Sequence, residues 1–115
     1  MRYLALIYTP ETSAPPSDGE PRQMMAEYGA YTEMIKERGA YLGGDALQPT
    51  STATTIRLRD GNLSTTDGPF AETKEQLGGY YLLECRDLDE AIELAAKIPG
   101  ARHGAIEVRP IQEFS

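Results

Sequence analysis

The stretch YYLLECRDLDEAIELAAKIPG, residues 80–100, holds a strand signal followed directly by a helix signal. Tyr80 to Cys85 is almost entirely apolar, which is typical of a strand inside a sheet. Asp87 and Glu90 have the spacing of a capping box, so a helix is predicted to begin there and to stop at Ile98-Pro99-Gly100. Its predicted inward face carries Leu88, Ala91, Ile92 and Ala95. A strand followed by a helix is therefore the basic unit of this chain.

The same order of strand and helix opens the chain. Tyr3 to Tyr8 is apolar at every position, which predicts a strand buried on both faces. Asp18 is predicted to cap a helix that ends at Gly39, because glycine readily takes the left-handed conformation at a helix end. The inward face of this helix is predicted to carry Met24, Tyr28, Tyr31 and Ile35. One more strand is predicted after each unit, over Tyr41 to Leu47 and over Ala105 to Arg109.

A β-hairpin is predicted between the two units. Ala53 to Leu58 alternates apolar and polar residues, as a half-exposed strand does. Asp60-Gly61 then predicts a tight turn into a second strand over Leu63 to Thr66, because glycine accepts a positive φ without steric cost. With this hairpin treated as an insertion, the remaining elements run strand, helix, strand, strand, helix, strand.

That order predicts an α+β fold, the ferredoxin-like split βαβ arrangement with an inserted β-hairpin, in one domain over residues 1–115. Two helices on one face of a sheet leave its other face partly apolar and uncovered. We therefore expect a homodimer in which the two sheets pack together.

Composition narrows the classes of partner. The chain has 18 acidic and 11 basic residues and a formal net charge of −7, which disfavours binding to nucleic acid or to an anionic membrane surface. No apolar run is long enough for a signal peptide or a membrane span. The single cysteine, Cys85, forms no intrachain disulfide, so we expect a cytoplasmic protein. No metal-ligand or cofactor motif is present, and we expect neither group.

The segment that follows the hairpin is the densest group of candidate functional residues. Thr66-Asp67-Gly68-Pro69-Phe70 predicts a rigid corner, with Phe70 anchored in the core. A short helical turn is predicted around Glu72 to Gln76, with Gly78-Gly79 as a break before the next strand. The corner either holds its charged side chains at the mouth of a cleft or only routes the chain back to the sheet. The charged candidates for ligand binding are Asp67, Glu72 and Lys74.

Two tyrosines and one histidine complete the candidates. Tyr8 ends the first strand and Tyr28 lies on the inward face of the first helix, so both hydroxyls are candidates for one cavity between helix and sheet. Alternatively, each tyrosine fills the core. His103 is the one side chain whose ordinary pKa is near neutrality, which makes it a candidate general base alongside Asp67. The alternative for His103 is a solvated histidine in a turn.

The run from Thr66 to Gly79, TDGPFAETKEQLGG, resembles the DGPF-domain branch of the YCII-related family. Further segments fit the same resemblance over essentially the whole chain: Met1 to Tyr8, Leu47-Gln48-Pro49, Ala53-Thr54-Thr55 and Glu107-Val108-Arg109-Pro110. The resemblance implies a ferredoxin-like domain that forms a dimeric α/β barrel. It also implies a possible sigma factor as partner, since some such proteins are encoded beside extracytoplasmic-function sigma factors.

The resemblance implies no definite activity. The YCII-like branch of the family has a histidine on the first helix and an aspartate before the proline that ends the second helix, and one relative is a dehydrochlorinase of a chlorinated hydroquinone. This chain has Tyr28 and Ile98 at those two positions, so the acid/base pair is absent. Tyrosine, with an ordinary pKa near 10, is a poor base at neutral pH.

Three hypotheses of function follow from these residues. The first is the binding of a small, partly aromatic or polar molecule between the first helix and the sheet, in a pocket lined by Tyr8, Tyr28, Asp67 and His103. The second is acid/base or elimination chemistry on a small cyclic substrate, with Asp67 or His103 as base and Tyr28 as acid or oxyanion donor. The third is a protein-interaction module linked to sigma-factor regulation.

Overall fold

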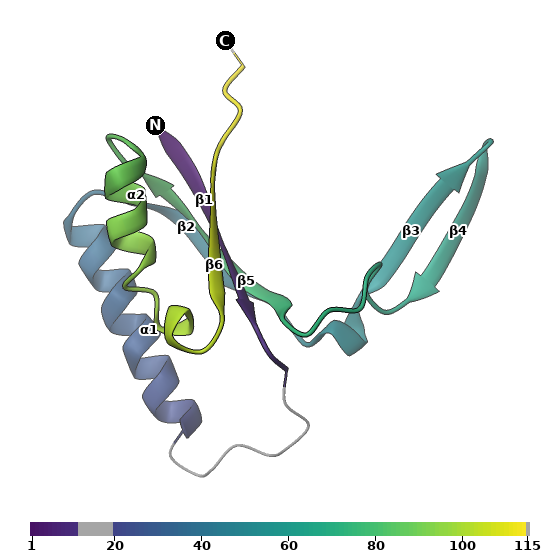
Figure 1. Cartoon of the computed structure of the whole chain (residues 1–115), viewed down its shortest axis with the longest axis horizontal. Coiled ribbons are helices and arrows are strands. Elements are labelled where there is room, and N and C mark those ends of the chain that lie inside the picture. Colours follow the sequence, from purple (N-terminus) through teal and green to yellow (C-terminus); the bar gives the residue numbers. More distant parts are fainter. Residues whose placement is uncertain (12–19, 115) are drawn as a thin grey trace.

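A computed structural model of the chain describes residues 1–11 and 20–114. Two helices cover one face of a four-stranded antiparallel sheet, and a separate two-stranded sheet stands on the far side (Figure 1). The elements of the main body are β1 (Arg2–Thr9), α1 (Glu20–Glu37), β2 (Tyr41–Ala46), β5 (Gln76–Glu84), α2 (Leu88–Ala95) and β6 (Ala105–Pro110). The hairpin is β3 (Thr54–Arg59) and β4 (Asn62–Asp67), and two short 3₁₀ helices are η1 (Thr50–Thr52) and η2 (Pro99–Arg102).

The strand order of the main sheet is β2-β5-β1-β6, which confirms the ferredoxin-like arrangement expected from the sequence. Each helix connects two strands that are separated by one antiparallel neighbour: α1 connects β1 to β2, and α2 connects β5 to β6. The hairpin β3–β4 leaves the body between β2 and β5 and pairs only with itself among the described residues.

The core lies between the helices and one face of the sheet. Tyr3, Ala5 and Ile7 of β1 are buried there, together with Tyr31 and Ile35 of α1. Leu4, Leu6 and Tyr8 alternate with the buried residues of β1 and are only half-buried. The expectation of a strand buried on both faces is therefore wrong for the single chain, because both helices lie on the same side of the sheet (Figure 1).

The second helix begins as expected and packs differently from expected. The Asp87 carboxylate accepts the backbone N–H of Glu90 at 2.9 Å, and the Glu90 carboxylate accepts the N–H of Arg86. Leu88 and Ile92, predicted to face inward, are about half exposed. The residues that α2 buries are Ala91, Leu94 and Ala95. The small alanines bring the helix close to the sheet and leave the two larger side chains at its margins.

Three predictions for the segment between hairpin and sheet are wrong. No helical turn forms over 72–76, and the strand β5 already begins at Gln76. Gly78-Gly79 lies within β5 and does not break it. Glycine suits position 79 because a Cβ there would lie 3.0 Å from the backbone oxygen of Asp45 on the neighbouring strand. Phe70 is 79% exposed and anchors nothing in the core. The predicted cap Asp18 lies outside the described residues.

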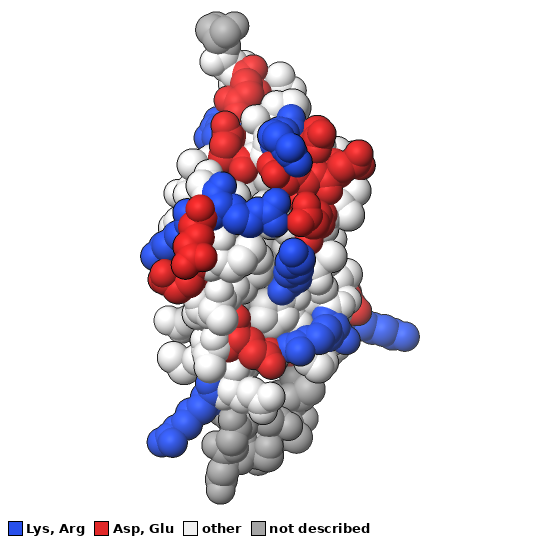
Figure 2. All heavy atoms as spheres, turned by 90° about the vertical axis from the view of Figure 1, so that its left-hand side faces the viewer, with Lys and Arg blue, Asp and Glu red and all other residues white. Residues whose placement is uncertain are grey.

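The outer side of the helix layer carries basic and acidic side chains side by side (Figure 2). Arg38 contacts the carboxylates of Glu90 and Glu93, and Arg102 pairs with Glu27. Much of the negative charge on this side of the molecule is therefore neutralised by neighbouring basic side chains. In the part of the chain that the structure describes, no helix has the length and apolar character that crossing a membrane requires.

Candidate functional site

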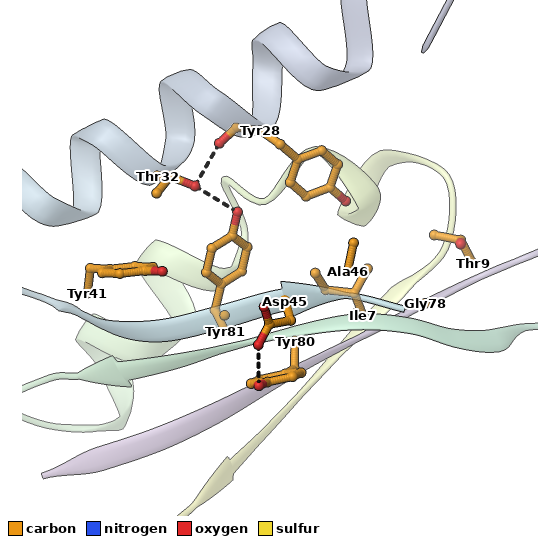
Figure 3. Close-up of a pocket in the computed structure, with 12 residues that line it drawn as sticks. Ile7, Thr9, Tyr28, Thr32, Tyr41, Asp45, Ala46, Gly78, Tyr80 and Tyr81 are labelled. Atoms are coloured by element: carbon orange, nitrogen blue, oxygen red, sulfur yellow. Dashed lines mark hydrogen bonds between the residues drawn. The ribbon is translucent and has the colours of Figure 1, made fainter. Parts of the chain in front are cut away.

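A cavity of about 280 Å³ lies between α1 and the sheet, and we call it the tyrosine cavity. Its hydroxyl groups come from Tyr28 and Thr32 on α1, Tyr41 on β2 and Tyr81 on β5 (Figure 3). Ile7 and Ala46 complete the apolar part of its wall near Tyr28. Its size is at the lower end for a site that holds a small organic molecule.

Two glycines make room for the tyrosine side chains. A Cβ on Gly44 would lie 2.8 Å from the Tyr81 ring and 2.8 Å from the backbone oxygen of Tyr80. A Cβ on Gly100 would lie 2.8 Å from the Tyr28 hydroxyl oxygen. Any larger residue at either position would push a tyrosine into the cavity or out of its present place.

A chain of hydrogen bonds orients the hydroxyl groups. The Thr32 hydroxyl donates its one hydrogen to the backbone oxygen of Tyr28 at 2.9 Å, so Tyr81 is the donor in the 3.0 Å bond between the Tyr81 and Thr32 hydroxyls (Figure 3). The Tyr28 hydroxyl accepts the backbone N–H of Gly100 at 3.1 Å. Tyr28 therefore keeps a hydrogen to donate, and the Tyr81 oxygen keeps a lone pair to accept with.

Neighbouring rings hold Tyr81 in position. The centroid of its ring lies 5.1 Å from that of Tyr31 and 6.5 Å from that of Tyr41, both in edge-to-face geometry. Tyr31 is itself fixed, because its hydroxyl donates to the backbone oxygen of Leu94 at 3.0 Å. Tyr81 is therefore held in place by its neighbours on this side of the cavity.

Among the described residues that line the tyrosine cavity, Asp45 is the one Asp, Glu, Lys or Arg, and it lies at the edge. Burial raises the pKa of both Tyr28 and Tyr81, so both hydroxyls stay protonated. The one carboxylate at its edge, Asp45, accepts the Tyr80 hydroxyl at 2.8 Å (Figure 3). Tyr80 alternates along β5 with the inward-facing Tyr81, so this pair lies on the other face of the sheet.

A second cavity, of about 670 Å³, lies at the foot of the hairpin, and we call it the foot cavity. Three segments that carried the family resemblance meet around it: 47–49 and 53–55, which are close in the sequence, and 69–71, which follows the hairpin. Tyr8 also lines this cavity, at the end of β1. A cleft at this corner was one of the two alternatives that the sequence left open. Pro69, Phe70 and Glu75 line the cavity, whereas the charged candidates expected at its mouth do not.

The predicted site residues do not converge. Tyr28 lines the tyrosine cavity, whereas Tyr8 lines the foot cavity, so the expectation that they share one cavity is wrong. His103 is exposed just after η2. Three further candidates are exposed and line neither cavity: Asp67, Glu72 and Lys74.

Sequence reasoning missed Thr32, Tyr41 and Tyr81. Thr32 lies one helical turn after Tyr28, so spacing along the helix was a usable signal for it. Tyr81 gave no such signal, because it stands next to Tyr80 in an apolar strand and only the pleat decides which of the two faces α1. Within residues 1–11 and 20–114, no three His, Cys, Asp or Glu side chains gather as metal ligands.

Comparison with known proteins agrees with this fold. A solved structure, the 5-chloro-2-hydroxyhydroquinone dehydrochlorinase of Burkholderia phenoliruptrix AC1100 in complex with 2,5-dihydroxybenzoquinone, superposes with a TM-score of 0.52. The match covers 99% of this chain and 96% of that one at 17% sequence identity, which shows a shared fold.

Sequence comparison gives the family. An uncharacterised protein of Rhizobium meliloti strain 1021 is 39% identical over 114 residues, covering 96% of this chain and 92% of that protein. The family model described as the YCII-related domain matches residues 1–115. The resemblance read from the sequence is thereby confirmed at the level of the family, and the chain belongs to the YCII-related family.

Proposed function

We propose that this protein binds a small, uncharged ring compound with oxygen substituents in the tyrosine cavity. The observation that carries the proposal is the pair of unused hydrogen-bonding positions there: the hydrogen of the Tyr28 hydroxyl and a lone pair of the Tyr81 oxygen. A ligand with one acceptor and one donor satisfies both positions. Aromatic walls favour a flat ring, and the absence of Lys and Arg among the described residues that line the cavity disfavours an anion.

The structural neighbour supports this class of ligand. The dehydrochlorinase was solved with 2,5-dihydroxybenzoquinone, a six-membered ring that carries carbonyl and hydroxyl oxygens. The two chains share only 17% identity, so the neighbour supports a fold able to hold such a ring and not a common reaction. For this reason we propose binding and propose no elimination step.

Acid/base catalysis has weaker support. The proposed bases Asp67 and His103 are exposed, and neither lines the cavity that contains Tyr28. Ile98, at the position of the family's aspartate, is buried with an exposed fraction of 1%. Among the described residues that line this cavity, the one carboxylate is Asp45, and it already accepts the Tyr80 hydroxyl.

Titration with hydroquinone tests the binding proposal, with chemical shifts of the protein as the readout. We expect Tyr28→Phe to weaken binding about five- to tenfold, the effect of one neutral hydrogen bond. Tyr8→Phe is the matched control, because Tyr8 lines the foot cavity and does not line the tyrosine cavity. Benzoate, which is charged, is expected not to bind. Equal weakening by the two tyrosine variants would contradict the proposal.

We also propose that the chain forms a homodimer through the uncovered face of the main sheet. Leu4 and Leu6 of β1 and Leu82 of β5 lie there half-buried, with Leu4 directly opposite Leu82. The chain has 8341 Å² of accessible surface, roughly 2,000 Å² more than a compact chain of its mass is expected to have. Sedimentation equilibrium of Leu4→Lys tests this, with dissociation as the expected result.

A further inference from the structure

The hairpin β3–β4 is amphipathic, although none of the described residues packs as a layer on it. Ile56, Leu58 and Leu63 form an apolar stripe on one face, because Leu58 lies directly opposite Leu63 and Ile56 is two positions away. These three side chains are 65%, 62% and 68% exposed. The opposite face is polar and carries Arg57 opposite Ser64 and Arg59 opposite Asn62. An exposed apolar face on a hairpin indicates that the hairpin packs against another surface.

The hairpin does not lie on its own body. It joins the body only at its foot and stands away from the uncovered face of the main sheet (Figure 1). A two-stranded sheet by itself is marginally stable in water. The Cα radius of gyration is 16.3 Å, against about 13 Å for a compact chain of this length. The extended shape and the exposed stripe both indicate that a second surface covers the hairpin.

The foot cavity has the properties of a receiving surface. Its walls are mainly apolar and include Leu47, Pro49, Phe70 and Leu77. Phe70, which is 79% exposed, has no covering layer in the single chain. One chain thus carries both a projecting apolar stripe and an apolar hollow of about 670 Å³. A surface that is complementary to itself in this way suits a twofold dimer.

Symmetry places the two features together. Leu58 and Leu63 flank the turn at the tip, whereas the foot cavity borders the other end of the same hairpin. When two hairpins lie antiparallel about a twofold axis, each tip reaches the foot of the other. Arg57 and Arg59 lie on the polar face of the hairpin, so insertion of the apolar stripe does not bury their charges.

We propose that the β3–β4 hairpin is an arm that inserts Leu58 and Leu63 into the foot cavity of a second copy of this chain, which returns the same contact. The inference rests on the proposed homodimer and adds to it a contact separate from the sheet face. The foot cavity is then a site that only the partner completes. Its occupant is the partner's apolar stripe.

Sedimentation equilibrium of Leu58→Asp tests the arm, with Ser64→Asp as the control that adds the same charge to the polar face. Because a twofold dimer contains each substitution twice, we expect Leu58→Asp to raise the dimer dissociation constant at least about 100-fold, and Ser64→Asp to change it less than about threefold. Circular dichroism verifies that both variants keep the body folded. Equal dissociation constants for Leu58→Asp and wild type would overturn the arm, even where Leu4→Lys dissociates the sheet-face dimer.

Disulfide trapping identifies the receiving surface. In a Cys85→Ser background, one chain carries Leu63→Cys and a second, differently tagged chain carries Phe70→Cys. With oxidised glutathione as the oxidant, we expect the mixture to form a covalent heterodimer, because tip and foot meet. Each variant alone is expected to form far less covalent dimer, because the two tips lie at opposite ends. Covalent dimers of Leu63→Cys alone, or none in the mixture, would overturn the contact with the foot cavity.

Discussion

The strand β1 and the strand β3 of the hairpin both carry apolar residues at every second position, yet these residues are buried in β1 and exposed in β3. In β1, alternate residues are buried under the helices, and Ala5 has no exposed surface. In the hairpin, the alternate residues Ile56 and Leu58 are more than 60% exposed. Apolar residues at every second position therefore predict that a strand forms, whereas the connections of the chain decide whether anything covers it. β1 is covered because α1 follows it and folds back over the sheet, and the hairpin has no such helix.

Removal of apolar side chains from the two regions sharpens this contrast most. Leu83 of β5 is completely buried, so we expect Leu83→Ala to lower the free energy of unfolding by about 2–5 kcal/mol. Leu63→Ala, with a side chain already 68% exposed, is expected to cost less than about 0.5 kcal/mol in dilute, monomeric protein. Urea unfolding measures both. Similar losses in the two variants would mean that the hairpin is packed within the single chain.

Replacement of glycine by alanine is also expected to destabilise the body more than the hairpin. A Cβ on Gly104 would lie 2.0 Å from the backbone oxygen of Tyr8, so Gly104→Ala must displace β1 or η2 and is expected to cost about 1–3 kcal/mol. Gly61 has open space around it and only a positive φ of 77°, so Gly61→Ala is expected to cost about 1 kcal/mol. Thermal unfolding ranks the two variants, and the reverse ranking would contradict this account.

Alkaline pH is expected to act on the body and not on the hairpin. Burial raises the pKa of Tyr31 and Tyr81, which stay neutral in the folded chain while they ionise in the unfolded chain above about pH 10. Their contribution is therefore intact below about pH 10 and is lost as the pH rises further, by about 1.4 kcal/mol per pH unit for a tyrosine that is still protonated in the folded chain. Urea unfolding at pH 9 to 11 measures the slope. Tyr31→Phe should flatten it, and an unchanged slope would show that Tyr31 is not responsible.

The smallest expected effect concerns the start of α2. Asp87→Ala removes the carboxylate that accepts the Glu90 N–H, which is expected to cost about 1 kcal/mol. Asp89→Ala is the matched control, since Asp89 lies in the first turn and makes no cap. Thermal unfolding distinguishes the two, and equal losses would assign the effect to charge near the helix end.

The sequence was sufficient wherever neighbouring residues decide the structure. The hairpin turn forms at Asp60-Gly61, with φ values of 52° and 77°, and Gly39 ends α1 with a φ of 72°. Both follow from the conformations that these residues accept. The order of strands and helices was predictable for the same reason. The candidate site was less predictable, since Tyr28 was identified and its partners Thr32 and Tyr81 were not.

The sequence by itself determined the order of the main strands and helices, the turns at Gly39 and Asp60-Gly61, the cap of α2 and the family, because each depends on residues close together in the chain. Only the tertiary structure decided that Tyr28 and Tyr8 line different cavities and that Phe70 and the stripe of Ile56, Leu58 and Leu63 stay exposed. These outcomes depend on which face of the sheet the helices cover. A side chain on a pleated strand has the same neighbours in sequence whether its face is covered or open.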